Sequence, residues 1–147
     1  MLRRSLCLLV LSAIAFAGPG GAADFGTPDQ AKAMLERAVA EIQKDKTAAL
    51  EMFTKGEGGF KDRDLYPYCG GPDGNFTAHP KLVGQSMKDL KDKAGMALGA
   101  ELYAKAKEGV ISEVAYMWPR PNETAPVQKV AYFTKIGDQI CAVGYYK

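Results

Sequence analysis

The single histidine, His79, is the first residue with chemical potential, because imidazole can act as a general base, a metal ligand or a hydrogen-bond donor. No metal-ligating partner lies at useful spacing from it, and the chain contains no HExxH motif, nucleophile elbow or phosphate-binding loop. The closely spaced acids lie among lysines, as is typical of a solvated surface: Asp62 with Asp64, and Asp89 with Asp92. These residue types therefore predict no enzyme activity, no metal site and no cofactor.

Aromatic side chains on the expected strands form the second group of interest. Tyr116 and Trp118 are two residues apart, so on one strand they point to the same face of a sheet. Tyr132 belongs to a second set of this kind. Periodicity alone favours packing of these aromatics in a core. The alternative is that Tyr and Trp side chains, with His79 and a basic residue, line a small and mostly apolar pocket.

The elements that would position these side chains begin with a helix. Thr27 and Gln30 fit a capping box, with Pro28 at the first helical position. Apolar residues then recur at helical spacing up to about residue 55, where several glycines follow. This pattern predicts one long N-terminal helix of roughly 42 Å at 1.5 Å per residue.

The remainder of the chain reads mostly as strands separated by turn residues. Apolar runs and turn clusters predict strands over 65–69, 75–78, 110–118, 127–136 and 140–146, and a second helix over 97–108. Gly137-Asp138 fits a two-residue hairpin turn. Hairpin connections imply antiparallel pairing, so the expected fold is α+β, with the long helix packed on an antiparallel sheet of about five strands.

Residues 1–23 have the three-part layout of a secretory signal peptide. Arg3 and Arg4 precede an apolar run over 6–17, which is shorter than the roughly 20 residues that a membrane helix needs. Small residues fit cleavage after Ala17 or after Ala23, and the intervening Gly/Pro stretch favours Ala23. We therefore expect a cleaved signal peptide over 1–23 and a periplasmic or secreted domain over 24–147.

The composition of the remaining chain limits its partners. It is long enough for one domain with its own core. The full sequence has 19 Lys and Arg against 17 Asp and Glu, and loss of Arg3 and Arg4 would balance the charge. Such a balance gives no reason to expect nucleic acid or an anionic membrane as a partner. No later segment reaches membrane length, so no membrane insertion is expected after signal cleavage.

Whether the cysteines form a disulfide depends on the compartment in which the domain is found. Cys7 would leave with the signal peptide, and Cys69 and Cys141 would remain. An even number of cysteines in an oxidising compartment favours one disulfide. The alternative is a pair of buried free thiols, which are common in protein cores.

Short motifs follow one another along nearly the whole expected domain: Tyr66-Pro67-Tyr68-Cys69 with Asp73-Gly74, Ala78-His79-Pro80, Leu82-Val83-Gly84 with Asp89-Leu90-Lys91-Asp92, Tyr116-Met117-Trp118-Pro119, Lys135-Ile136-Gly137-Asp138, and Val143-Gly144-Tyr145-Tyr146. Each motif is weak alone, but in this order they are fairly specific. The sequence resembles the single Cache domain family, type 2. The resemblance implies a PAS-like sensor fold, with a long N-terminal helix on one face of an antiparallel sheet and a small-molecule pocket on the other.

The resemblance also implies the site. Carried over by motif, the ligand-binding residues are His79, Tyr116, Trp118 and Tyr132. Lys129 and Lys135 alternate away from Tyr132 along one strand, so neither is assigned as a cation for a carboxylate. In the family's sheet, the strands that carry the two remaining cysteines could be neighbours.

Most members of the family are the extracytoplasmic parts of chemoreceptors and histidine kinases, and many bind short carboxylates. The resemblance therefore implies an exported small-molecule-binding domain, for a short carboxylate or an amino acid. It would act as a free binding protein or as an accessory to a membrane-bound sensor kinase or chemoreceptor. The alternative is a protein-interaction or structural module of the same fold, whose pocket is filled by its own side chains.

Overall fold

The structure is a computed structural model that describes residues 24–147, so the expected signal peptide lies outside the described residues. These residues form three helices and five strands: α1 (Pro28–Lys44), α2 (Lys46–Lys55), β1 (Pro67–Gly70), β2 (Phe76–Ala78), α3 (Leu98–Lys105), β3 (Ser112–Pro119), β4 (Pro126–Ile136) and β5 (Gln139–Tyr146). No helix in this part of the chain is both long enough and apolar enough to cross a bilayer.

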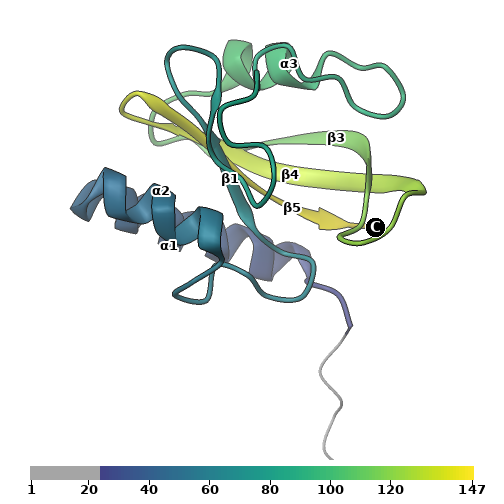
Figure 1. The fold of residues 1–147 in the computed structure, drawn as a ribbon, viewed down its shortest axis with the longest axis horizontal. Coiled ribbons are helices and arrows are strands. Elements are labelled where there is room, and N and C mark those ends of the chain that lie inside the picture. Colours follow the sequence, from purple (N-terminus) through teal and green to yellow (C-terminus); the bar gives the residue numbers. More distant parts are fainter. Residues whose placement is uncertain (1–23) are drawn as a thin grey trace, which may run out of the picture.

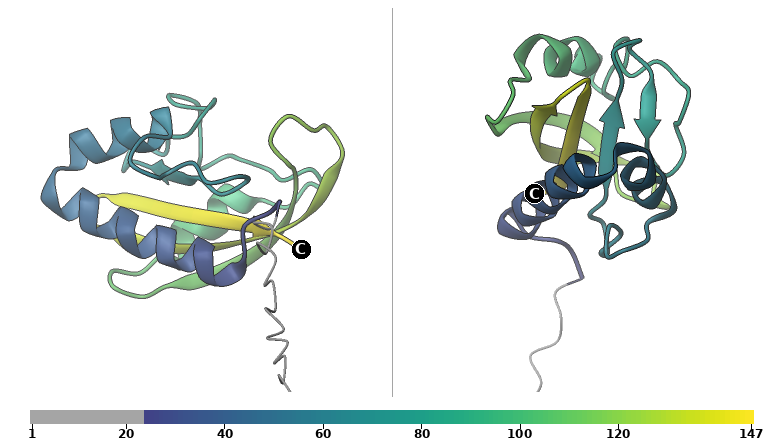
Figure 2. Two further views of the ribbon diagram at one scale, coloured as in Figure 1. Left: turned by 90° about the horizontal axis from the view of Figure 1, so that it is seen from below. Right: turned by 90° about the vertical axis from the view of Figure 1, so that its left-hand side faces the viewer.

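The five strands form one antiparallel sheet in the order β2-β1-β5-β4-β3. Helices α1 and α2 lie along one face of this sheet, and α3 with its flanking loops lies on the other, as Figures 1 and 2 show. The predicted α+β class, with helices on an antiparallel sheet of five strands, is confirmed.

The predicted single N-terminal helix is instead two helices. The start is as expected: Thr27 and Gln30 form the capping box, and Pro28 occupies the first turn. The break comes at Asp45, whose backbone is extended (φ −155°, ψ 100°) and whose side chain accepts the N–H of Ala48. Aspartate is a strong N-cap residue, so it starts a new helix where periodicity alone predicted continuation. The break lets α1 pack mainly on β5 and β4, while α2 packs on β1 and β2.

The sheet register decides which side chains share a face. β4 and β5 form a hairpin in which Ile136 pairs with Gln139, closed by the predicted Gly137-Asp138 turn with Gly137 at φ +58°. β1 is the second strand of the order, paired with the edge strand β2 on one side and with the central strand β5 on the other. Alternate residues of β1, β4 and β5 therefore point towards the α1/α2 face or the α3 face.

A disulfide joins two neighbouring strands on the α1/α2 face. Cys69 of β1 and Cys141 of β5 are direct partners in the register, and their sulfur atoms are bonded. Both residues are fully buried in the apolar cluster beneath the helices, which includes Leu35 and Phe53. The favoured interpretation of the two cysteines as a bonded pair therefore agrees with the structure.

Candidate functional site

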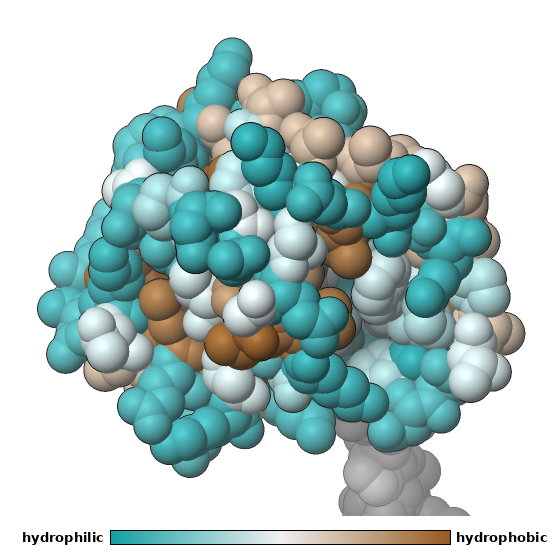
Figure 3. Space-filling view, turned by 45° about the horizontal axis from the view of Figure 1, so that its top comes forward, coloured by the Kyte–Doolittle hydropathy of each residue, from teal (hydrophilic) through white to brown (hydrophobic). Residues whose placement is uncertain are grey.

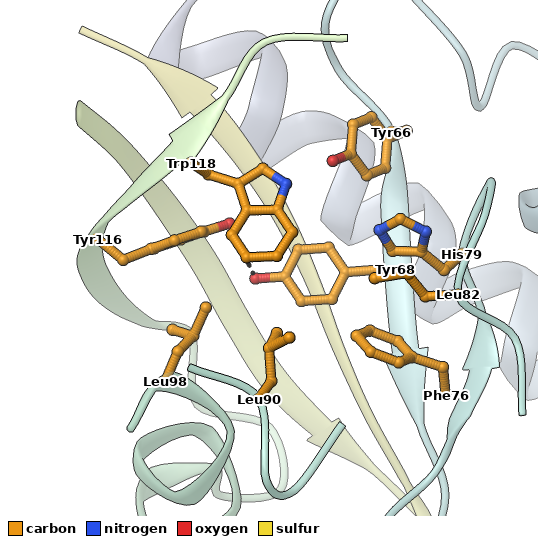
Figure 4. Close-up of a pocket in the computed structure, with 9 residues that line it drawn as sticks. All are labelled: Tyr66, Tyr68, Phe76, His79, Leu82, Leu90, Leu98, Tyr116 and Trp118. Carbon is orange, nitrogen blue, oxygen red and sulfur yellow. Dashed lines mark hydrogen bonds between the residues drawn. The ribbon is translucent and has the colours of Figure 1, made fainter. Parts of the chain in front are cut away.

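Nine residues surround a small cavity on the α3 face of the sheet, shown in Figure 4. They come from the two sides of the sheet, at β1 and β2 and at β3, from the residue before β1, from the long connection between β2 and α3, and from the first residue of α3: Tyr66, Tyr68, Phe76, His79, Leu82, Leu90, Leu98, Tyr116 and Trp118. Aromatic rings and their polar atoms gather around the centre and top of this view, and Leu90, Leu98 and Phe76 lie below them. The arrangement provides one mainly apolar side and one side rich in hydrogen-bond donors.

Three of the four residues predicted to bind ligand lie together in this cavity. Tyr116 and Trp118 point from the same face of β3, with ring centroids 6.4 Å apart, and His79 follows directly after β2. The imidazole of His79 stands edge-on to the rings of Tyr66 and Phe76, at centroid distances of 5.5 and 5.2 Å. Tyr116 and Trp118 therefore form one part of the cavity wall.

The fourth residue, Tyr132, lies on the opposite face of the sheet, which corrects its predicted place in the pocket. It packs against the cluster beneath α1, and its ring is 5.9 Å from that of Tyr145. On β4 it is Ala131 and Phe133 that face the same side as Tyr116. The motif resemblance assigned the right strand, but strand alternation turns Tyr132 away from the cavity.

A pair of tyrosine hydroxyls forms the polar centre of the cavity. The hydroxyl oxygens of Tyr68 and Tyr116 are 3.2 Å apart, and both side chains are buried. Burial raises the pKa of both groups well above the usual tyrosine value, so each hydroxyl stays protonated. One of the two protons is used in the bond between them, and the other remains available to a ligand.

The proton on His79 has a defined position. The backbone N–H of Lys81 donates to Nδ1 of His79 at 2.9 Å, so Nδ1 carries a lone pair and Nε2 carries the proton of the neutral ring. Burial, aided by the charges of Lys129 and Lys81, lowers the pKa of His79 to about 4. At neutral pH the imidazole is therefore uncharged and presents an Nε2–H donor.

A buried lysine, which sequence reasoning set aside, lies directly behind Tyr66. Lys129 is only 1 % exposed, and its Nζ donates to the hydroxyl of Tyr66 at 3.2 Å. The same Nζ lies 4.4 Å from the ring centroid of Tyr66 and 4.7 Å from that of Tyr146. Burial lowers the pKa of Lys129 to about 7, against the opposing charge of Asp64. None of the ion pairs among residues 24–147 involves this ammonium.

The register explains why Lys129 reaches this position. It pairs with Tyr116 of β3 on one side and with Tyr146 of β5 on the other, so all three point to the α3 face. Gly144 leaves room for the lysine stem, since a Cβ at that position would lie 2.4 Å from Cε of Lys129. A glycine within a strand often marks such a close approach. The glycine of Val143-Gly144-Tyr145 is thus the sequence feature that could have indicated a large side chain packed against this strand.

The cavity itself is very small. Its volume is about 10 Å³, enough for one water molecule at most. A larger groove of about 750 Å³ adjoins it and shares four of its residues: Tyr66, His79, Leu82 and Trp118. Figure 3 shows one face of the molecule as mostly hydrophilic, with small hydrophobic patches between the polar residues. The four shared side chains therefore separate the inner cavity from the outer groove.

Helices on one face of an antiparallel sheet, and a donor-lined cavity on the other, define a PAS-like sensor domain. The profile of the Cache domain family matches residues 31–146, nearly all of the described chain. The chain therefore belongs to the Cache domain family, and the sequence resemblance is confirmed.

Known relatives are chemotaxis proteins. A segment of 55 residues, 37% of this chain, is 36% identical to the methyl-accepting chemotaxis protein McpP of Pseudomonas putida. That match covers 10% of the receptor, so the chain corresponds to a small part of its relative's length. The similarity is thus to part of a chemotaxis receptor and not to an enzyme.

Solved structures share the fold over most of the chain. A methyl-accepting chemotaxis protein from Vibrio parahaemolyticus superposes with a TM-score of 0.65 and 25% identity, covering 80% of this chain and 86% of that one. A Cache chemosensory domain from work on carboxylic acid recognition gives 0.56 and 22%, covering 80% and 86%. The periplasmic sensor domain of a chemotaxis protein gives 0.57 and 22%, covering 80% and 88%.

Proposed function

We propose that this domain is an exported sensor domain that binds a short-chain carboxylate at the cavity on the α3 face. The observation that carries the proposal is Lys129, a buried ammonium that contacts the cavity-lining Tyr66 and has no ion pair among the described residues. A buried charge is costly unless a counter-charge compensates it. A ligand carboxylate would supply that counter-charge and restore the usual pKa of Lys129.

The other polar groups at the cavity favour the same ligand class. Tyr66 and the Tyr68–Tyr116 pair present hydroxyls, and His79 presents Nε2–H. All of these groups can donate to a carboxylate oxygen, and charge-assisted hydrogen bonds of this kind are the strong ones. The lining contains no carboxylate that could receive an ammonium group. Of the two ligand classes expected from the sequence, the structure thus favours a carboxylate without an α-amino group over an amino acid.

Binding would require the cavity to open. A volume of about 10 Å³ does not hold even a short acid, so Trp118, Leu82 or Tyr66 must move when the ligand enters from the outer groove. The small volume also favours the second candidate, a ligand-free interaction module whose pocket is filled by its own side chains. Ligand-induced stabilisation distinguishes the two candidates.

The test compares propionate with alanine, which differs from it only by the α-amino group. We expect propionate to raise the melting temperature, corresponding to about 2.7 kcal/mol at 100 times its dissociation constant. Alanine should have no effect, because its ammonium would face Lys129 and a set of donors. Lys129→Met and Trp118→Ala should each abolish the response. Tyr132→Phe, on the opposite face, is the matched control and should retain it.

A different result would favour the interaction module. In that case, no short acid stabilises the wild-type domain, and Trp118→Ala lowers the free energy of unfolding by about 3–5 kcal/mol, as expected for a core tryptophan. The likeness to a domain studied for carboxylic acid recognition is at 22% identity and concerns the fold, so the ligand class is inferred from the residues of this chain.

The cellular role is part of the same proposal. The signal-peptide pattern over 1–23 and the chemotaxis relatives support a periplasmic domain that is free or accessory to a membrane-bound chemoreceptor or sensor kinase. Fractionation of cells that express the full chain should place a protein beginning near Asp24 in the periplasm. An intact mass that retains residues 1–23 in the membrane fraction would contradict export with cleavage.

A further inference from the structure

Arg120, the residue after β3, has a guanidinium held between two aromatic rings. Its Cζ atom lies 4.3 Å from the ring centroid of Phe25 and 4.9 Å from that of Tyr146. Pro119, immediately before it, is fixed because its carbonyl accepts the hydroxyl of Tyr146 at 2.7 Å. Contacts of this kind orient the flat guanidinium and reduce the entropy lost when it binds a partner.

The hydrogen-bonding capacity of this guanidinium is not satisfied within the domain. Nε of Arg120 is buried and has no hydrogen-bond partner among residues 24–147. The ion pairs of this part of the chain do not include Arg120 either. Stacking occupies the faces of a guanidinium but leaves its in-plane N–H groups available, and these match the geometry of a carboxylate. Arg120 is thus prepared for an anion.

The surroundings of Arg120 are those of a binding groove. It lines the outer groove of about 750 Å³, a volume within the range of ligand sites. The charged residues of this lining are five cations and one acid: Lys55, Lys61, Arg63, Lys81, Arg120 and Glu123. Lys55 is paired with Glu51 and Arg63 with Asp62. The groove is therefore electropositive and attracts anions towards the inner cavity.

Arg120 and Lys129 are close enough to serve one ligand. Nζ of Lys129 lies 4.7 Å from the ring centroid of Tyr146, and Cζ of Arg120 lies 4.9 Å from the same point. The distance between Nζ of Lys129 and Cζ of Arg120 therefore cannot exceed the sum of these two distances. Trp118, two residues before Arg120, lines both the inner cavity and the groove.

We propose that Arg120 forms a second anion-binding subsite in the outer groove, so that the ligands include dicarboxylates held across both cavities. For its inner end, this inference rests on the proposed function. One carboxylate lies at the donors around His79 and Tyr66, near Lys129. The other lies against the in-plane N–H groups of Arg120. The α3-side leucines then accommodate the alkyl tail of a monocarboxylate, and the groove accommodates the second acidic group of a dicarboxylate.

The experiment uses propionate and succinate, because succinate is propionate with a second carboxylate on its terminal carbon. Calorimetry on residues 24–147 gives both affinities for the wild type, Arg120→Gln and Arg120→Lys. We expect the ratio of succinate to propionate affinity to fall about tenfold or more in Arg120→Gln, the loss expected for a charge-assisted hydrogen bond. Arg120→Lys retains the charge without the planar fork, so its ratio should lie between the other two.

A second variant distinguishes a specific effect on succinate binding from a general folding defect. Phe25→Leu removes one of the two stacked rings and leaves the guanidinium in place, and it should lower the succinate affinity several-fold more than the propionate affinity. An unchanged ratio in Arg120→Gln and Phe25→Leu would overturn the outer subsite and leave the proposed function intact. Succinate binding that depends on Arg120, with no propionate binding at all, would instead support the subsite and contradict a monocarboxylate site.

Discussion

The two faces of the five-stranded sheet bury different kinds of side chain. Beneath α1 and α2 the core consists of aliphatic and aromatic residues such as Leu35 and Phe53, with a disulfide between two strands. On the α3 face, tyrosine hydroxyls, a histidine and a lysine are buried as well. Both faces are built from the same strands by simple alternation, yet only one of them contains groups that favour a charged partner.

The contrast indicates that the two faces have different roles: one mainly stabilises the fold, and the other contains the groups of the proposed site. Apolar burial stabilises a fold by about 25 cal/mol per Å², whereas burying a charge without a partner opposes folding. The α1/α2 face therefore supplies stability that offsets the cost of Lys129 on the other face. Functional sites commonly break the rules that the remainder of a protein obeys. Variants on the two faces should consequently affect stability and binding in opposite ways.

The largest expected effect is on the α1/α2 face. Replacing both Cys69 and Cys141 by Ala removes a cross-link between positions 72 residues apart. On the loop-entropy model this lowers the free energy of unfolding by about 4 kcal/mol. Urea denaturation of the oxidised wild type and of the double variant measures the difference.

The same double variant should bind propionate as the wild type does, because the disulfide lies on the face away from the cavity. Affinities are compared at a temperature where both proteins are folded. The two faces would not be independent if the double variant lost as much binding free energy for propionate as it lost in free energy of unfolding, or more. Stability and binding would then not be divided between the two faces.

Lys129→Met should have the opposite pair of effects. It removes a charge that is 1 % exposed and has no ion pair among residues 24–147, while it keeps a long apolar stem in the space left by Gly144. At pH 6 we expect the free energy of unfolding to rise, on the order of a few kcal/mol, and propionate binding to be lost. Denaturation at pH 6 and calorimetry test the two effects separately. A destabilised Lys129→Met would mean that the ammonium is already compensated within the domain.

Sequence reasoning predicted most of the fold because its signals were local. The capping box at Thr27, the glycine after α2 and the Gly137-Asp138 turn each fix the chain through neighbouring residues. The break at Asp45 was missed because a mid-helix aspartate and an N-cap aspartate look alike until tertiary packing selects one of them. Strand boundaries differed from the predictions by only one or two residues.

The site was only partly predictable, because it depends on the register between neighbouring strands. Spacing on one strand placed Tyr116 and Trp118 together, whereas relating β3 to β4 requires knowledge of the loop that joins them. A shift of one residue turns every side chain of a strand to the other face. Without the register between β3 and β4, the prediction placed Tyr132 in the pocket and left out Lys129, which is the direct partner of Tyr116.

The pH dependence of stability should separate the two faces further. The pKa of Lys129 is lowered from 10.5 to about 7 in the folded domain, so between these values the unfolded chain binds more protons. Stability therefore rises with pH across this window, by at most about 1.4 kcal/mol per pH unit. Lys129→Met should lack this rise. Measurements from pH 7 to 9 stay below the ionisation of tyrosine in the unfolded chain, at a pKa of about 10, and below that of Tyr66, whose pKa burial raises to about 12.

Ligand binding should change in the opposite direction across the same window. A carboxylate binds the charged form of Lys129, so the propionate affinity should be constant below about pH 7 and fall by up to about tenfold per pH unit above it. An affinity that stays constant up to pH 9 would show that Lys129 does not supply the charge. The stability slope and the affinity slope thus test one titrating group by independent measurements.

The smallest expected effects come from removing a single hydroxyl on each face. Tyr116→Phe leaves the buried Tyr68 hydroxyl without the partner now 3.2 Å away, at a cost of about 1 kcal/mol in the free energy of unfolding. It also removes a donor from the cavity, so propionate should bind several-fold more weakly. Tyr132→Phe keeps the ring that packs against Tyr145 and should change stability by no more than about 0.5 kcal/mol, with no effect on affinity. Since the two substitutions delete the same atom from adjacent strands, any difference in propionate affinity reports the face of the sheet alone. Equal affinities in the two variants would place the ligand away from the Tyr68–Tyr116 pair and confine the binding site to the region around Tyr66 and His79.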